Sequence, residues 1–337
     1  MPGSVSIRTF IGVLSGCIVT GKRYCKHNNK TDGGSMESVA VLSHIVVDEV
    51  FDSEHRLLAT EVGGAGAYAA AGASLAGEAG STLLVSGAGR EDKALLEEWC
   101  TRRQISTTGL FEVGVHSPRT RIRYFSDGER EETPVFGLEH FESHTPLPRH
   151  IPDQARPLSG VYLFHDHERS YWEEVEAFAR TFTGPILWEI SLDACRIEHR
   201  AEVAELMAVV DILSINETEA RALSGASRLE GAIAWLQRSA TTVLLRRGSQ
   251  GSLVLAGGAV HVVGTAPTAA VDPTGGGNSY TGAFLACYAR SGDLALASRT
   301  AAAAASAIVA APGAPEIDDR SRRRVALAAR SVTFESR

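Results

Sequence analysis

Paired cysteines, basic clusters and long apolar runs are all scarce in this sequence. Its five cysteines are scattered and none forms a Cys-x-x-Cys pair, so a reduced, intracellular compartment is expected and a structural zinc site is not. The formal net charge is -7, without a long Lys or Arg run, which argues against non-specific nucleic-acid binding. The alanine-rich stretch 301–311 is too weakly hydrophobic for a membrane span, and Pro312-Gly313 ends it. We therefore expect a cytoplasmic protein with neither nucleic acid nor membrane as a partner.

The sequence does contain enough apolar material for a sizeable core. It has 337 residues, of which 44% are hydrophobic, enough for one large α/β domain or two small ones. Residues 1–35 differ from the rest, because one acid stands against five basic residues: Arg8, Lys22, Arg23, Lys26 and Lys30. We interpret 1–35 as a disordered extension before a folded domain at 36–337, and an organelle-targeting segment is the alternative.

From Ser38 onward, strand-like and helix-like segments alternate. Short apolar runs predict strands at 39–47, 82–87, 161–164, 185–190, 211–215 and 242–246. Longer stretches between them predict helices at 65–76, 91–103, 171–182, 198–209 and 229–238. This alternation predicts a doubly wound, mostly parallel sheet. Residues 56–62 predict a strand of a flap, and 119–136 predict a hairpin that turns at Asp127-Gly128.

A glycine-rich stretch at 271–284 carries most of the functional information. It reads V-D-P-T-G-G-G-N-S-Y-T-G-A-F and places three consecutive glycines directly before a predicted helix. Glycine lets a ligand approach the main chain, and the amides at a helix start attract phosphate or a developing oxyanion. With Asp272 and Thr274 just upstream, the pattern indicates a loop that binds phosphate or a developing oxyanion. A tight turn needed only for packing is the alternative.

Two further motifs come directly after predicted strands. The first reads N-E-T-E, and Asn216 and Glu219 have the spacing of a helix-capping box. The second reads R-R-G-S-Q-G over 246–251. An arginine there either contacts phosphate or lies in a solvated hairpin turn.

These stretches together resemble the PfkB (ribokinase-like) sugar and nucleoside kinases, over residues 38 to about 318. The second signature of that family is usually written Asp-Thr-x-Gly-Ala-Gly-Asp, and its last Asp is the catalytic base, which is replaced here by Asn278. The resemblance implies a three-layer α/β/α fold with a small β flap, the cofactors ATP and Mg²⁺, and a small hydroxylated substrate. The implied catalytic residues are Gly275, Gly276, Gly277 and Asn278.

The resemblance also implies where the nucleotide binds. Glu219 organises Mg²⁺ indirectly, and Arg246 stands where the family often has a Thr near the nucleotide phosphates. ATP lies near the glycine loop and the segment before Pro312-Gly313. The implied nucleotide-binding residues are Asn216, Glu219, Arg246, Gly248, Gly251, Asp272, Thr274 and Gly313.

The acceptor site is implied to lie under the β flap, with lid elements near 48–62 and 118–136 through which a homodimer could form. Tyr68 stands where the family has an Asn for substrate hydroxyls, so the pocket differs from that of a ribose or fructose kinase. Asp48 either takes the place of a sugar-binding carboxylate or is a solvated loop residue. Two arginines share one face of a hairpin arm and either cover an anionic substrate or lie in solvent. The candidate substrate-binding residues are Asp48, Gly63, Gly64, Tyr68, Arg121 and Arg123.

The replacement at Asn278 leaves two functions open. The preferred one is an ATP-dependent kinase of a small sugar-like or nucleoside-like substrate, slow because a neutral amide cannot accept the proton of the acceptor. The alternative is an inactive nucleotide- or sugar-binding pseudokinase with a regulatory or scaffolding role. His165-Asp166-His167 is a lesser candidate for metal ligands, because alternate residues of an extended segment share a face. Glu189, near the carboxyl end of a predicted strand, is a lesser candidate for substrate contact.

Overall fold

The computed structural model describes residues 38–125, 130–155, 157–239 and 241–337. The described residues belong to one compact unit. The predicted N-terminal extension at 1–35 lies outside the described residues, as does the Asp127-Gly128 turn.

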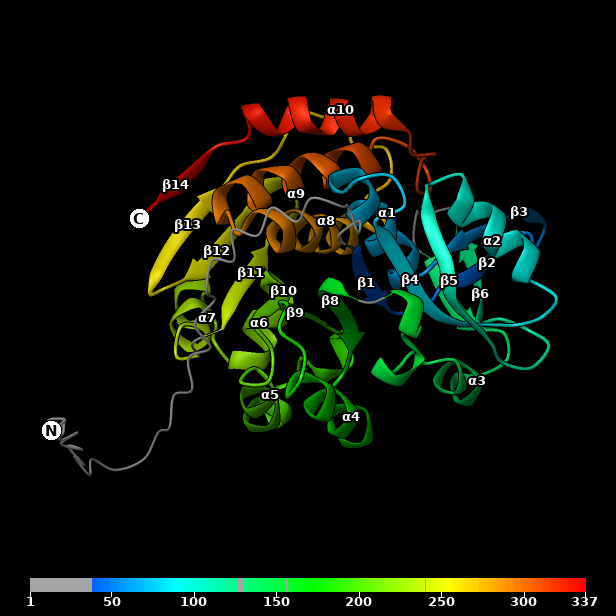
Figure 1. Cartoon of the computed structure of the whole chain (residues 1–337), viewed down its shortest axis with the longest axis horizontal. Helices are drawn as coiled ribbons and strands as arrows, with labels where there is room; N and C mark the ends of the chain where they lie inside the picture. Colours follow the sequence, from blue (N-terminus) through cyan, green and yellow to red (C-terminus); the bar gives the residue numbers. More distant parts are fainter. Residues whose placement is uncertain (1–37, 126–129, 156, 240) are drawn as a thin grey trace, which may run out of the picture. The chain divides into compact units, whose positions relative to one another are not determined.

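A ten-stranded sheet forms the middle of the fold (Figure 1). Its strands, from one edge to the other, are β14 (Phe334–Ser336), β13 (Ala259–Val263), β12 (Ser252–Ala256), β11 (Thr242–Arg246), β10 (Ile212–Asn216), β9 (Ile186–Ile190), β8 (Leu158–His165), β1 (Ser38–Leu42), β4 (Thr82–Ala88) and β5 (Ile105–Glu112). From β5 to β11 every neighbouring pair is parallel, and β12 to β14 add an antiparallel edge. The predicted doubly wound, mostly parallel sheet is confirmed.

Helices cover both faces of this sheet, as Figure 1 shows, so the fold has three layers. One face packs against α1 (Ala65–Ala76), α2 (Lys93–Thr101), α8 (Gly276–Ser291) and α9 (Leu294–Ile308), and α10 (Asp319–Ala328) packs on α1 and α9. The other face packs against α4 (Arg169–Ala179), α5 (Arg200–Leu206), α6 (Glu217–Ser224) and α7 (Leu229–Leu236). Adjacent strand residues alternate between the two cores, as for Leu187 and Trp188. Among the described residues, no helix has the length and apolar character to cross a membrane.

A second sheet of four strands lies beside the main one, in the order β3 (Leu57–Gly63), β2 (Val46–Phe51), β6 (Arg119–Tyr124) and β7 (Arg130–Pro134), and α3 (Leu138–Ser143) follows β7. The single strand predicted at 39–47 is wrong, because this run supplies β1 to one sheet and β2 to the other. Between them the amides of Ser43 and Ile45 turn to β4, where they donate to Val85 O (3.4 Å) and Ser86 Oγ (3.0 Å). The predicted hairpin is present as the antiparallel pair β6–β7.

Helix α8 is held over the sheet by an unusually close approach to α1. A Cβ added at Gly282 of α8 would overlap with the carbonyl of Ala69, and one added at Gly72 of α1 would overlap with the backbone of Ser279. The two helices therefore touch backbone to backbone. This contact fixes the position of α8, and with it the position of the glycines at the start of the helix.

Replacement of Gly282 by Ala tests this contact. The added methyl has no room against the α1 backbone, so we expect the free energy of unfolding to fall by about 2 kcal/mol or more. Urea denaturation measures it. The control is Glu205→Ala on the exposed face of α5, which should change stability by less than about 0.5 kcal/mol. Equal effects of the two changes would contradict the proposed packing.

Candidate functional site

The start of α8 is a tight glycine loop. Gly275, the N-cap residue, has φ of +72°, and the ring of Tyr68 lies so close beneath it that any side chain there would overlap with the ring. Upstream, Thr274 N–H donates to Asp272 Oδ1 at 2.9 Å, and Val309 O accepts the amide of Asp272 at 3.2 Å. Tyr68 is buried and supports the loop. The expected role of Tyr68 as a substrate contact stays a prediction.

A buried carboxylate lies next to this loop. Glu189 of β9 is 1% exposed and its side chain is on the α8 face of the sheet. It accepts hydrogen bonds from Tyr162 Oη (2.9 Å) and Asn278 Nδ2 (3.0 Å), and Arg246 Nη1 lies 2.8 Å from its Oε1. Burial and the neighbouring carboxylate raise the pKa of Tyr162 well above its usual value, so its hydroxyl remains a donor. These contacts compensate the negative charge of Glu189, whose burial without partners would be strongly unfavourable.

Asn278, in the first turn of α8, therefore has its amide directed toward β9. Its Nδ2 is the group that meets Glu189, and an aspartate at this position would instead bring two carboxylates together. Asn278, which stands where the family has its catalytic base, is thus a hydrogen-bond donor to the carboxylate of Glu189. From the sequence, Glu189 was only a lesser candidate, because nothing in its local pattern predicts burial with three partners.

Arg246 joins this carboxylate to a second one. Its Nη2 lies 3.8 Å from Glu219 Oε2, and its guanidinium lies directly against the Cα of Gly277, where any side chain would overlap with it. The side chain is 13% exposed. Its Nε is buried and has no hydrogen-bond partner among the described residues. A fixed positive charge therefore lies beneath the amides that begin α8.

Asn216 and Glu219 form a reciprocal capping box at the start of α6. Glu219 N–H donates to Asn216 Oδ1 at 2.9 Å, and Asn216 N–H donates to Glu219 Oε2 at 2.8 Å. Burial raises the pKa of Glu219, while Arg246 opposes that shift. The capping role expected from the sequence is present, and it directs the Glu219 carboxylate toward Arg246.

Comparison with known proteins identifies this arrangement. The model of the pfkB family carbohydrate kinases matches residues 36–319. The chain belongs to this family. It is 26% identical over 262 residues to a cytidine kinase from Thermococcus kodakarensis, a match that covers 76% of this chain and 90% of the relative.

Solved structures of the family share the fold. A nucleoside kinase from Methanocaldococcus jannaschii superposes with a TM-score of 0.67 at 19% identity, over 87% of this chain and 99% of that one. A structure described as a ribokinase II from E. coli, in complex with ATP and Mg²⁺, has a TM-score of 0.67 at 19% identity, over 82% and 94% of the two chains. Kinases of the ribokinase family use ATP with Mg²⁺.

The family resemblance predicted acceptor residues that the structure divides between the two faces of the second sheet. Register pairs Asp48 with Thr120 and Glu49 with Arg121, and neighbouring residues point to opposite faces. Asp48 lies against Gly63, next to the start of α1. The exposed Arg121 lies 3.7 Å from Glu49.

Arg123, the other predicted arginine, also contacts a residue other than Asp48, since it donates to Ser53 O at 3.1 Å. The structure therefore brings Asp48, Gly63 and Gly64 together without the two arginines.

The remaining residues that were expected to bind the nucleotide lie in two turns. Gly248 begins the one-turn 3-10 helix Gly248–Gln250 that joins β11 to β12, and Gly251 ends it. The hairpin turn of the alternative is present, but the side chain of Arg246 is mostly buried and does not lie in solvent. Arg247, the residue before this turn, is partly buried and pairs with Glu217 at 2.9 Å. Gly313 follows α9 near the second sheet, where the space for a Cβ lies 4.0 Å from Glu61 Oε2.

His44 is a residue of the site region that sequence reasoning missed. It lies between β1 and β2, at the point where the strand order reverses and doubly wound folds bind ligands. Its Nε2 is 2.9 Å from Phe141 O, and burial lowers its pKa to about 4. No local signal marked it, because His44 lies inside the run that predicts a single strand at 39–47.

The buried ion pair of Arg246 predicts a large, reversible loss of stability. Arg246→Met leaves the Glu189 charge without its cation, so the free energy of unfolding should fall by about 3–5 kcal/mol. Adding Glu189→Gln removes that charge and should recover most of the loss. The control is Arg90→Met, which breaks the exposed pair with Glu112 and should cost about 1 kcal/mol or less. Urea denaturation of these three variants and of Glu189→Gln alone decides; additive losses in the double variant would refute the coupling.

His44 predicts a pH dependence. Because its folded-state pKa is lowered to about 4, the unfolded chain binds the proton first as pH falls below the ordinary histidine range. Stability from this residue is complete above about pH 6.5 and is lost toward pH 4. Between pH 7.5 and 5 the wild type should therefore lose about 2 kcal/mol more than His44→Gln, measured by urea denaturation. Parallel pH profiles would show that His44 is not the group responsible.

Proposed function

We propose that this protein transfers the terminal phosphoryl group of ATP to a hydroxyl of a small sugar-like or nucleoside-like molecule. The observation that carries the proposal is the start of α8, where glycines expose helix amides directly above the Arg246 guanidinium. Helix amides and a guanidinium both bind phosphate, and a site that combines them favours the charge that develops during phosphoryl transfer.

The residues present fit MgATP. The amides of Gly277 and Asn278 would hold the transferred phosphoryl group, since the Gly276 amide already donates to Pro273 O at 3.2 Å. Arg246 would add its positive charge next to them. Glu219 would hold Mg²⁺ through water, since its carboxylate is already directed into the site by the capping box. When bound, Mg²⁺ neutralises phosphate charge. Asp48, Gly63 and Gly64 would line the acceptor side beneath the second sheet, which would act as a lid.

Proton transfer is the step that this site performs poorly. The Asn278 amide cannot accept a proton, and the neighbouring carboxylate of Glu189 is buried and neutralised by Arg246. A positioned base typically contributes about 10²–10⁴-fold to the rate. The proposed kinase is therefore slow, with catalysis that rests on positioning and on the phosphate site.

A pseudokinase is the second candidate, and the same buried pair favours it. Glu189 and Arg246 neutralise each other inside the site, which suits a stable binding module as well as a slow enzyme. Such a protein would bind nucleotide without turnover. The acceptor panel below separates the two.

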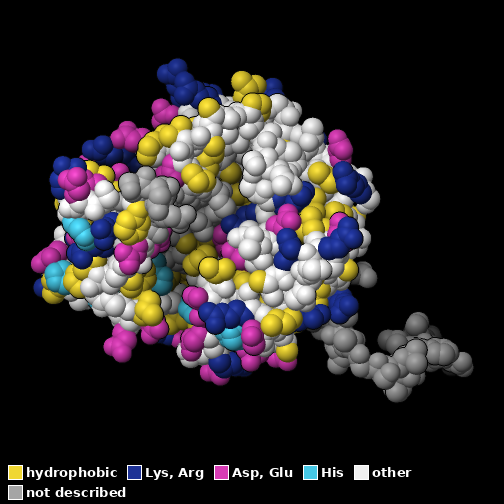
Figure 2. Space-filling model, turned by 180° about the vertical axis from the view of Figure 1, so that it is seen from behind, with side chains coloured by type: hydrophobic (Ala, Val, Ile, Leu, Met, Phe, Trp, Pro, Cys, Tyr) yellow, Lys and Arg dark blue, Asp and Glu magenta, His cyan; other side chains and the backbone are white. Residues whose placement is uncertain are grey.

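A homodimer through the second sheet and a cytoplasmic location complete the proposal. Leu57 and Leu58, on the edge strand β3, are 55% and 62% exposed, which suits a surface that a second copy covers. On the face in Figure 2, acidic and basic side chains are interspersed, which is consistent with a small-molecule partner.

We expect the wild type to bind MgATP, measured by calorimetry and by thermal shift. No heat and no shift at millimolar nucleotide would refute both candidates. Asn278→Asp alone places two carboxylates together and should gain little activity.

The double variant Glu189→Gln with Asn278→Asp exchanges the two side-chain types. An amide on β9 then donates to a carboxylate at the start of α8, and that carboxylate is the base that the wild type lacks. ATP consumption with sugars and nucleosides should then rise by ~10-fold or more over the wild type. Glu189→Gln alone is the control, because it lacks the new base. Nucleotide binding without gain on any acceptor, in a folded double variant, would favour the pseudokinase.

A further inference from the structure

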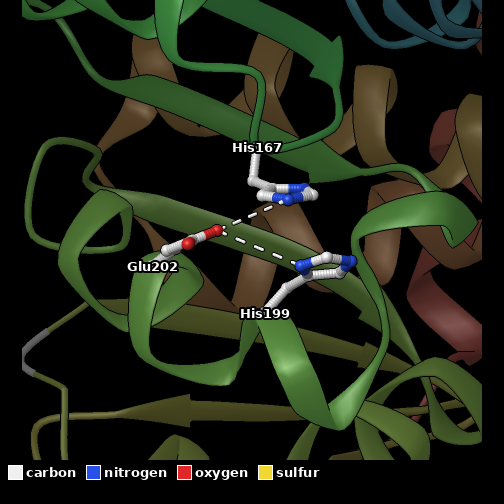
Figure 3. Close-up of side chains that lie close together, drawn as sticks. All are labelled: His167, His199 and Glu202. Carbon is white, nitrogen blue, oxygen red and sulfur yellow. Dashed lines mark ion pairs between the residues drawn. The ribbon is translucent and has the colours of Figure 1, made fainter.

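A second polar cluster lies on the other helical layer of the fold. His167 follows β8, His199 ends the short helix η4 (Ile197–His199), and Glu202 is in the first turn of α5. Figure 3 shows the three side chains pointing toward one another. His167 Nε2 lies 3.4 Å from Glu202 Oε2, and His199 Nδ1 lies 4.0 Å from the same oxygen.

The sequence grouped His167 with His165, and the structure separates them. His165 stacks on Tyr171 with ring centroids 3.7 Å apart and pairs with Asp166 at 2.9 Å. His167 stacks instead on His199, with centroids 3.9 Å apart. The strand ends at His165, so the alternation that would give the two histidines one face does not continue.

We propose that His167, His199 and Glu202 bind a first-row transition metal ion, with Zn²⁺ as the best match. One ligand atom from each residue lies within 4.8 Å of the others. Tetrahedral zinc with bonds of about 2.0–2.1 Å separates neighbouring ligand atoms by roughly 3.3 Å. The closest pair already has this spacing, and small side-chain rotations bring in the third atom.

The type of ligand selects the metal. Two imidazoles and one carboxylate suit Zn²⁺, whereas Mg²⁺ and Ca²⁺ prefer oxygen ligands alone. Glu202 is largely exposed, which leaves room for water at the fourth position. The neighbouring Arg200 is held over the Trp235 ring, 5.5 Å from its centroid.

A metal here would tie the segment after β8 to α5. The same end of β8 is bonded to β9, because His165 O accepts from Trp188 Nε1 at 2.8 Å. The ion would therefore brace the two strands that supply Tyr162 and Glu189 to the candidate site, and it would raise the melting temperature. The proposal does not depend on the kinase activity, because it concerns binding by residues outside that site.

The test uses the full chain without an affinity tag. Zn²⁺ binding is measured by calorimetry, and Co²⁺ is used as a spectroscopic probe whose visible absorption reports nitrogen and oxygen ligands in tetrahedral geometry. His167→Gln, His199→Gln and Glu202→Gln should each weaken Zn²⁺ binding by ~10-fold or more, because even the outer partners of a metal site have effects of that size. Acidification should weaken binding in the wild type, since histidine binds metal as neutral imidazole.

The matched control is His116→Gln. His116 also pairs with a glutamate, with its Nδ1 3.1 Å from Glu91 Oε2, and has no part in the cluster. It should bind Zn²⁺ as the wild type does, and Zn²⁺ should raise the melting temperature of both. A full chain that binds no Zn²⁺, or three cluster variants that bind it as tightly as His116→Gln, would overturn the proposal and leave an ordinary His–Glu ion pair.

Discussion

The neutralisation of one buried carboxylate is the constraint on which the rest of this site depends. Glu189 lies in the sheet interior, where an uncompensated charge would be strongly unfavourable. Its three partners come from β8, β11 and α8, so its burial fixes the relative positions of these elements. Gly277 has to be glycine because the guanidinium that neutralises this carboxylate lies against it. The glycine loop therefore serves two purposes, since it exposes helix amides above and makes room for Arg246 below.

The glycine-mediated contact between α1 and α8 provides the frame for that arrangement. Gly64 begins α1 next to the second sheet, and Gly275 begins α8 above the buried network. Because the two helices touch through their backbones, the acceptor side and the phosphate side of the site are built on one rigid unit. Small residues at the crossing thus act on function through position, without contact to any ligand.

Much of the fold could be predicted from the sequence, because apolar runs and turn residues are local signals. Strand β11 and helix α1 have the predicted bounds, and the capping box at Asn216 was visible from spacing alone. The polar strand β5 and the short β14 were not predicted, since neither has a clear apolar pattern. The partners of Asn278 could not be predicted either, because Glu189 and Arg246 meet it only through the order of strands in the sheet. His44 was missed for the same reason, as its burial depends on Phe141 and its surroundings.

The strand order also has a consequence for how this chain folds. β1 lies between β4 and β8, and its first residue, Ser38, pairs with Leu158, far along the chain. Contacts so distant in sequence form slowly, because a long loop has to close before they stabilise anything. Glu189 meets Arg246 and Asn278 only after β11 and α8 have been added. A partly folded intermediate without them would have to keep this carboxylate in water, so docking of β9 against α8 is expected to be a late step of folding.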